Sequence, residues 1–160
     1  MKLHEWQQRQ KTAKGGEIVS FSYYDEDGEV KKDLFDKMAE EEAKKWASVR
    51  DRKGKPELSN TQVRKFYNEI KAIERYIELK GEENFQQKLP EIKMLKAKAA
   101  YAYGRRLQRR GGSITREFKD FLDKHIGQIN TYKDFKTFCK FFEAVVGFFE
   151  FYSQPSVKIH

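Results

Sequence analysis

The chain is poor in the residues from which most metal and nucleophilic sites are built. Its 160 residues include one cysteine, Cys139, and three histidines. A lone cysteine forms no internal disulfide, and the aromatic residues around Cys139 predict a small buried hydrophobic side chain. The histidines lack metal-ligand spacing, and no CxxC or HxxxH pair occurs. His125 is interpreted as a hydrogen-bonded histidine on a helix surface rather than as a ligand or a proton shuttle.

Recognisable catalytic motifs are also missing. The GxxxxGK phosphate loop, the GxGxxG turn and the GxSxG elbow do not occur, so nucleotide hydrolysis and serine chemistry have no support. Helical ribonucleases of the HEPN type place an arginine closer to the histidine than the eight residues that separate Arg116 from His125. We therefore expect a protein that is not an enzyme and that uses no cofactor or metal.

Long apolar runs are absent as well. No stretch approaches the ~20 residues of a membrane span, and the first residues lack the apolar region of a signal peptide. With 38% hydrophobic and 36% charged residues, the composition fits one domain with one core. The low cysteine content then favours a cytoplasmic protein that contacts no membrane.

Positive charge is plentiful, and it is concentrated in one segment. Residues 84–110 hold eight lysines and arginines against one acid, Glu91, and so carry +7 of the formal net charge of +8. Alanines and tyrosines fill many of the positions between these cations. A basic helix of this kind can lie close to a polyanion, with phosphates neutralised and rings beside bases or sugars. The plainer alternative is a solvated charged face.

The spacing of the apolar residues predicts an all-α, single-domain bundle of about five helices. We expect residues 1–32 to form a polar N-terminal arm, residues 33–153 the bundle and residues 154–160 a tail. The arm ends near an acidic turn at residues 25–28, which fits either a short hairpin or a segment that orders on a partner. From Asp33 the period becomes helical, with an apolar face that consists of Phe35, Ala39, Ala43 and Trp46.

The second helix is the most clearly marked. Ser59 and Gln62 have the spacing of a capping box, and Gly81 ends the helix. Its apolar stripe consists of Val63, Phe66, Ile70, Ile73 and Ile77. The far side, at about 100° per residue, carries Arg64, Asn68, Lys71 and Arg75. This side is either a row of cations for a polyanion or an ordinary wet face with Glu-to-Lys pairs.

The third helix contains the basic segment. We expect it to begin at Pro90 and to end at the glycine pair 111–112. Its apolar face consists of Ile92, Leu95, Ala99, Ala102 and Tyr103. One flank carries Lys98, Arg105 and Arg109, and the other carries Lys93 and Lys96. Met94 and Tyr101 lie between these rows, where they form either a second packing stripe or a surface under a bound strand.

Two further helices complete the predicted bundle. The fourth places Phe118, Phe121, Leu122 and His125 on one face. The fifth opens with Thr131 and Asp134 at capping spacing, and about half of its circumference is apolar. A helix with so wide an apolar surface is either the central helix of the bundle or partly a subunit contact.

Three segments resemble one family, and they occur in the family's order. They are LSNTQVRKFY at residues 58–67, LPEIKMLKAKAAYAYGR at 89–105 and FCKFFEAVVGFF at 138–149. The family is the small helical subunit of the type III-A CRISPR interference complex, the Csm complex. The likeness covers about residues 58–152, and residues 1–57 contribute little to it. The third segment has a more aromatic ending than is associated with the family, which suggests a subunit contact particular to this chain.

The resemblance implies a non-catalytic, all-α subunit of a ribonucleoprotein in antiviral defence. Several copies would stack head to tail beside the other subunits and hold CRISPR guide RNA and target RNA through their phosphates, while the guide supplies specificity. The matching positions are Arg64, Lys96, Lys98 and Arg105. The helical rows add Lys71, Arg75, Lys93 and Arg109 to the predicted RNA-binding residues. An alternative of another class is a protein-interaction module whose basic helix docks an acidic protein and never contacts RNA.

Overall fold

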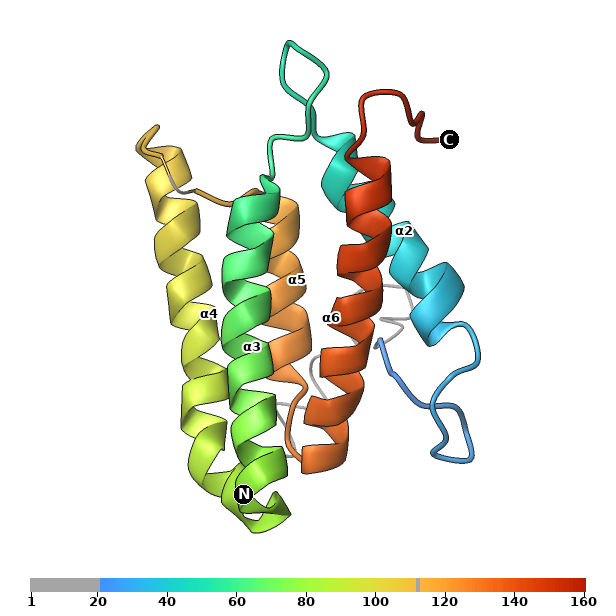
Figure 1. Ribbon diagram of the computed structural model, residues 1–160, viewed down its shortest axis with the longest axis vertical. Coiled ribbons are helices and arrows are strands. Elements are labelled where there is room, and N and C mark those ends of the chain that lie inside the picture. The colour runs from blue at the N-terminus through green and yellow to red at the C-terminus, as the bar shows by residue number, and fades with distance from the viewer. Residues whose placement is uncertain (1–20, 112) are drawn as a thin grey trace, which may run out of the picture.

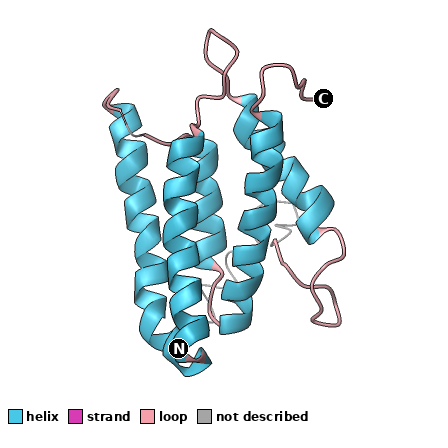
Figure 2. Cartoon of the chain, in the orientation of Figure 1, coloured by secondary structure: helices cyan, strands magenta, loops and turns pink. Residues whose placement is uncertain are grey.

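The described part of the chain is a bundle of α-helices. The computed structural model describes residues 21–111 and 113–160, so most of the predicted N-terminal arm lies outside it. Five α-helices follow one another (Figure 1), and the described residues contain no strand (Figure 2). The predicted all-α bundle of about five helices is confirmed.

The helices pack around α6, which runs antiparallel to α3 and in the same general direction as α2 (Figure 1). The elements are η1 (Leu34–Met38), α2 (Ala39–Ser48), α3 (Asn60–Lys80), η2 (Glu82–Asn84), α4 (Phe85–Leu107), α5 (Arg116–Gly127) and α6 (Tyr132–Tyr152). A tight turn at η2 makes α3 and α4 antiparallel neighbours, and α6 packs against both α2 and α3 (Figure 1). As a result, α3 and α4 form one outer side of the molecule, and α2 lies on the other.

The first helical segment begins with a turn that the sequence pattern does not reveal. Residues Leu34–Met38 form a π-helix, in which the Met38 N–H donates to the Asp33 carbonyl over 2.9 Å. In a π-turn, residues five apart share a face, so Leu34 lies above Ala39 and is fully buried. Phe35, which was expected on the apolar face, is 37% exposed instead. That part of the prediction was wrong because it assumed an α-helical period.

The predicted limits of α3 are confirmed, whereas those of α4 are not. The Ser59 hydroxyl accepts the Gln62 N–H, and Gly81 ends α3 at φ +107°. The next helix begins at Phe85 rather than at Pro90, which lies inside it. Phe85 is buried, and its ring lies 6.1 Å from that of Phe135. Packing of this first turn against α6 explains why the helix starts before the proline.

The C-terminus of α4 is closed by a Schellman motif. The Arg110 N–H donates to the Arg105 carbonyl over 2.8 Å, and the Arg109 N–H donates to the Arg106 carbonyl over 2.9 Å. Arg109 has φ +56° and takes the left-handed position that is usually held by glycine. The helix therefore ends at Leu107, before the glycine pair that was expected to stop it.

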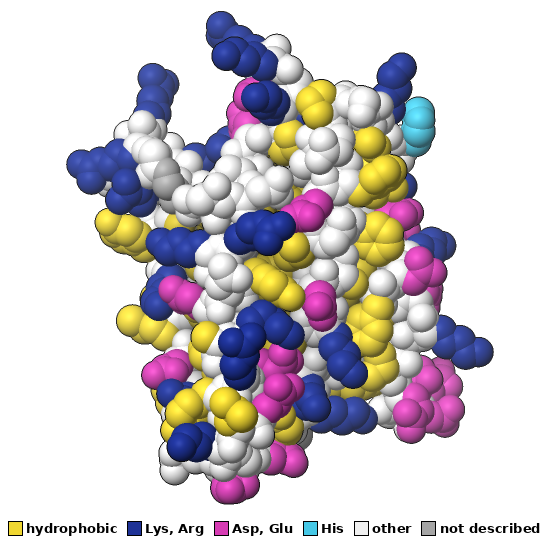
Figure 3. All heavy atoms as spheres, viewed as in Figure 1, with side chains coloured by type: hydrophobic (Ala, Val, Ile, Leu, Met, Phe, Trp, Pro, Cys, Tyr) yellow, Lys and Arg dark blue, Asp and Glu magenta, His cyan; other side chains and the backbone are white. Residues whose placement is uncertain are grey.

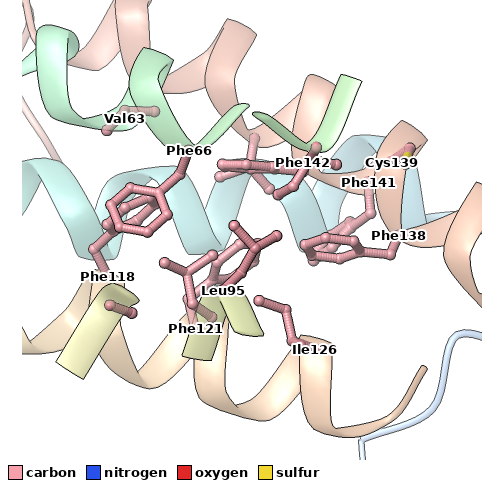
Figure 4. Packing of buried hydrophobic residues seen from close by; sticks show 14 of the residues in the cluster. Val63, Phe66, Leu95, Phe118, Phe121, Ile126, Phe138, Cys139, Phe141 and Phe142 are labelled. Carbon is pink, nitrogen blue, oxygen red and sulfur yellow. The ribbon is translucent and has the colours of Figure 1, made fainter. Parts of the chain in front are cut away.

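Aromatic side chains of α2, α5 and α6 fill the core. The Trp46 ring lies 4.9 Å from Phe118 and from Phe121, and 6.1 Å from Phe142. Phe138, Phe141 and Phe142 of α6 lie around Phe121 of α5 (Figure 4), with ring centroids 5.5 to 6.2 Å apart. A complete capping box of Thr131 and Asp134 starts α6, as predicted. The wide apolar surface of α6 is thus largely explained by its central place in the bundle.

Residues 21–32 dock on the bundle through a tight turn. Tyr24 and Val30 form one antiparallel bridge, and the Tyr24 hydroxyl donates to Asp134 over 2.8 Å. Tyr23 is buried, and its hydroxyl lies 2.7 Å from Nδ1 of His125. These contacts hold residues 21–32 against α5 and α6.

Candidate nucleic-acid interface

The cations of α3 and α4 lie on a mixed surface. Figure 3 shows this side of the molecule, where dark blue lysines and arginines alternate with magenta carboxylates and exposed yellow apolar side chains. Because carboxylates lie among the cations, the +7 of the basic segment does not act as an uninterrupted positive strip. Each predicted cation therefore has to be considered with its partner.

The predicted row on α3 turns toward α6. Arg64 forms an ion pair with Glu150 of α6. Lys71 lies 2.5 Å from the carboxylate of Glu74, and this hydrogen bond raises the pKa of Lys71. Arg75 is exposed. Lys71 and Arg64 are thus charged but already paired, and a phosphate would have to compete with a carboxylate for each of them.

The predicted row on one flank of α4 turns toward α3. Lys98 Nζ lies 3.0 Å from the Glu69 carboxylate of α3. The Arg105 Nε–H donates to the Gly111 carbonyl over 2.7 Å, and Arg109 is exposed beyond the end of the helix. The two rows of cations therefore lie side by side on neighbouring helices. They do not face each other across the bundle.

The other predicted pair on α4 lies at the C-terminus of α5. Lys93 Nζ donates to the carbonyls of Ile126 and Gly127 over 2.8 and 3.3 Å. Partial burial, followed by the charge of Lys96, lowers the pKa of Lys93. Cations stabilise the carbonyl end of a helix, so Lys93 has a clear structural role. Lys96 remains exposed beside it.

The outward side of α4 is apolar and lined with small residues. Met94 is 57% exposed and Tyr101 is 68% exposed, so neither forms a packing stripe within this chain. Ala97 and Ala100 are exposed, and a side chain added at Gly104 would meet only open space. Tyr103 packs against the core, as predicted. A strand could approach the α4 backbone closely here, with cations on both sides.

Several cations of α3 and α4 were missing from the predicted set, among them Lys88, which pairs with Glu91. Lys65 is exposed on α3, next to Arg64. Arg106 forms an ion pair with Glu57 and ties α4 to the loop before α3. Arg110 is exposed at the end of the Schellman motif. A strict row of i, i+7, i+11 positions excluded these residues, although charge alone would have included them.

The two residues with catalytic potential are buried. His125 is only 2% exposed, and burial, followed by the charge of Lys124, lowers its pKa to about 3. It is hydrogen-bonded as expected, but it lies in the core and not on a helix surface. Cys139 is also buried, as predicted, and burial raises the pKa of its thiol. Within residues 21–111 and 113–160, no three histidine, cysteine or acidic side chains cluster as metal ligands would.

Comparison with known protein families identifies the chain. A family model described as Csm2 Type III-A matches residues 32–155. The chain belongs to the Csm2 family. It is thus a small subunit of the type III-A CRISPR Csm complex, and the predicted family is confirmed. The match reaches from η1 to the end of α6, so residues 32–57 also carry the likeness.

Two other findings complete the comparison. Neither a curated protein nor a solved structure matches this Csm2 chain. In the described part of the chain, every helix is too short or too polar to span a membrane.

Proposed function

We propose that this Csm2 chain is a non-catalytic subunit that binds guide and target RNA through backbone phosphates in a cytoplasmic type III-A effector complex. The complex would act in antiviral defence, and Csm2 would stabilise its filament of subunits. The main support for the proposal is the surface on the outer side of α4, where small side chains lie between cations on both flanks.

The dimensions of this surface support binding along a strand. The 23 residues of α4 extend over about 34 Å at 1.5 Å per residue. The exposed cations Lys96 and Lys98 lie on α4, Arg109 lies just past its end, and Lys65 and Arg75 lie on the neighbouring α3. Contacts of this kind hold a strand by its phosphates and carry no sequence information. Specificity would then come from base pairing with the guide.

The C-terminal end of α4 is basic, and the turn before α4 carries two acids against one lysine, Lys80, which supports end-to-end contacts between copies. Arg109, Arg110 and the exposed Leu107 lie at the C-terminal end of α4. At the opposite end (Figure 1), the turn between α3 and α4 exposes Glu82, Glu83 and Leu79. In the proposed filament, the basic end of one copy contacts the acidic end of the next. Such a head-to-tail interface leaves both ends open to extension.

RNA binding is tested by neutralising cations on the α3 and α4 surface. The variant carries Arg64→Gln, Lys98→Gln and Arg105→Gln, because glutamate would add repulsion beside Glu150 and Glu69. A matched control replaces Lys32, Lys37 and Lys45 with Gln, since these exposed lysines lie on or before α2. Affinity for several unrelated single-stranded RNAs is measured by fluorescence anisotropy against salt concentration.

The expected result is a smaller salt dependence in the first variant only. Each lost phosphate contact makes the slope of log affinity against log salt shallower by about 0.7. For three lost contacts the slope of the variant should therefore be shallower by up to about 2. All the RNAs should behave alike, and circular dichroism should show unchanged helicity. Equal affinities of the variant, the control and the wild-type chain would overturn the proposal.

The end-to-end contact is tested by charge exchange. Arg109→Glu with Arg110→Glu should abolish self-association in sedimentation velocity, and so should Glu82→Arg with Glu83→Arg. An equal mixture of the two variants should restore self-association, because each basic end then meets an acidic end of the other variant. Self-association that both double substitutions leave intact would refute the contact.

A further inference from the structure

A groove with an apolar floor runs between α3 and α4. Its volume is about 640 Å³, and its lining includes Phe66 of α3 and Ala97 and Ala102 of α4. Met94 and Tyr101 also line it, although more than half of each side chain is exposed. The core does not need these two side chains, and they carry no charge with which to bind phosphate. Their exposure is therefore not explained by folding or by phosphate binding.

The spacing of these side chains makes a slot. Met94 and Tyr101 are seven residues apart on α4, which is two helical turns or about 10 Å. Between them lie Ala97, whose side chain is a single methyl group, and Lys98, whose Nζ extends toward Glu69 of α3. Two large side chains with a small one between them leave room for a flat group to lie against Tyr101.

The Tyr101 ring is held in place while one side stays accessible. The Arg105 guanidinium carbon lies 5.9 Å from the ring centroid, and Arg105 Nη1 donates to the Tyr101 hydroxyl over 3.4 Å. A cation at this distance from an aromatic ring is attracted to it. The ring is therefore preorganised, with 68% of the side chain exposed.

The charge at the groove suits an anionic chain. Lys65, Lys98 and Arg105 line it against one carboxylate, that of Glu69. An anion that entered would find cations on both helices. A docked amphipathic helix would instead lay its apolar face into a hydrophobic groove, whereas three cations lie among the lining residues of this one.

We infer that this groove is a nucleobase subsite, in which one unpaired base of a bound RNA stacks on Tyr101 beside Met94. Its adjoining phosphates contact Lys98, Lys65 and Arg105. This inference rests on the proposed RNA binding and adds a contact to the base, which the phosphate contacts do not supply. Stacking needs only a π-face, so the subsite accepts any base.

The experiment separates bases from phosphates. Wild-type chain is titrated by fluorescence anisotropy with a single-stranded RNA of 12 nucleotides and with an abasic strand of the same length and charge. Tyr101→Ala, Tyr101→Phe and Met94→Ala are compared with Phe151→Ala, which removes an exposed aromatic side chain of α6 outside the groove lining. Circular dichroism verifies that every variant is folded.

The wild-type chain should bind the base-containing strand roughly tenfold more tightly than the abasic strand, from one stacked base. Tyr101→Ala should abolish most of this preference, whereas Tyr101→Phe and Phe151→Ala should retain it. Equal wild-type affinity for the two strands would overturn the subsite and leave phosphate binding intact. A Tyr101→Ala variant that keeps the preference as fully as Phe151→Ala would overturn the subsite in the same way. A wild-type chain that binds neither strand would overturn both the proposed function and this inference.

Discussion

Lys98 of α4 and Glu69 of α3 form an ion pair, with 3.0 Å between Nζ and the carboxylate, at the groove where RNA binding is proposed. Both side chains remain partly exposed, at 51% and 36%. Exposed pairs of this kind contribute little to stability. In the proposed function, Glu69 instead competes with a phosphate for the Lys98 cation.

Glu69→Gln should therefore strengthen RNA binding. Removal of the competing carboxylate should raise affinity about two- to fivefold, which corresponds to the usual worth of an exposed pair. Fluorescence anisotropy with single-stranded RNA at constant salt measures the effect. Glu41→Gln on α2 is the control, because it changes the net charge equally at another exposed glutamate. Equal gains in the two variants would mean that Glu69 does not compete with RNA for Lys98.

Arg109→Gly should stabilise the chain and at the same time weaken its RNA binding. Arg109 has φ +56°, and a left-handed conformation costs a non-glycine residue about 1 kcal/mol that glycine does not pay. The variant should raise the free energy of unfolding in urea by about that amount, while the lost charge weakens RNA binding. Arg110→Gly is matched in charge but has no positive φ to relieve. If Arg110→Gly stabilised the chain as much, the backbone explanation would be wrong.

Much of the fold could be predicted because local patterns determine it. The stripe through Phe66 and Ile70, the serine cap of α3 and the capping box of α6 all follow from residues within a few positions of one another. The π-turn before α2 could not be predicted, because a change from i, i+4 to i, i+5 hydrogen bonding leaves no distinct spacing.

The candidate site was less predictable because its electrostatics depend on tertiary contacts. Glu150 lies 86 residues from Arg64 along the chain, and Glu69 lies 29 residues from Lys98. A helical wheel places each cation on a face of its own helix but does not say which neighbouring helix that face meets. Lys93 was predicted to bind RNA for this reason, although the carbonyl end of α5 lies beside it.

The π-turn can be tested by a pair of truncations. Leu34→Ala removes a fully buried side chain and should lower the free energy of unfolding by roughly 2–5 kcal/mol. Phe35→Ala removes a side chain that is 37% exposed, so its cost should be clearly smaller. Urea unfolding monitored by circular dichroism measures both. An α-helical start would reverse the order of the two variants.

The buried pair of Tyr23 and His125 should make stability depend on pH. Burial lowers the pKa of His125 from 6.5 to about 3, so the folded chain holds a neutral imidazole where the unfolded chain takes up a proton. Stability is therefore complete above about pH 6.5 and is lost progressively as the pH falls toward 3. Between pH 7 and pH 5 this one group should lower the free energy of unfolding by about 2 kcal/mol.

Urea unfolding at pH 7, 6 and 5 measures this dependence, because most carboxylates still stay ionised in that range. The double variant Tyr23→Phe with His125→Phe replaces both hydrogen-bonding partners with apolar rings and should lose most of the slope. His160→Gln should keep the wild-type slope, because His160 is exposed. A wild-type chain equally stable at pH 7 and pH 5 would show that His125 is protonated, or reaches solvent, in the folded state.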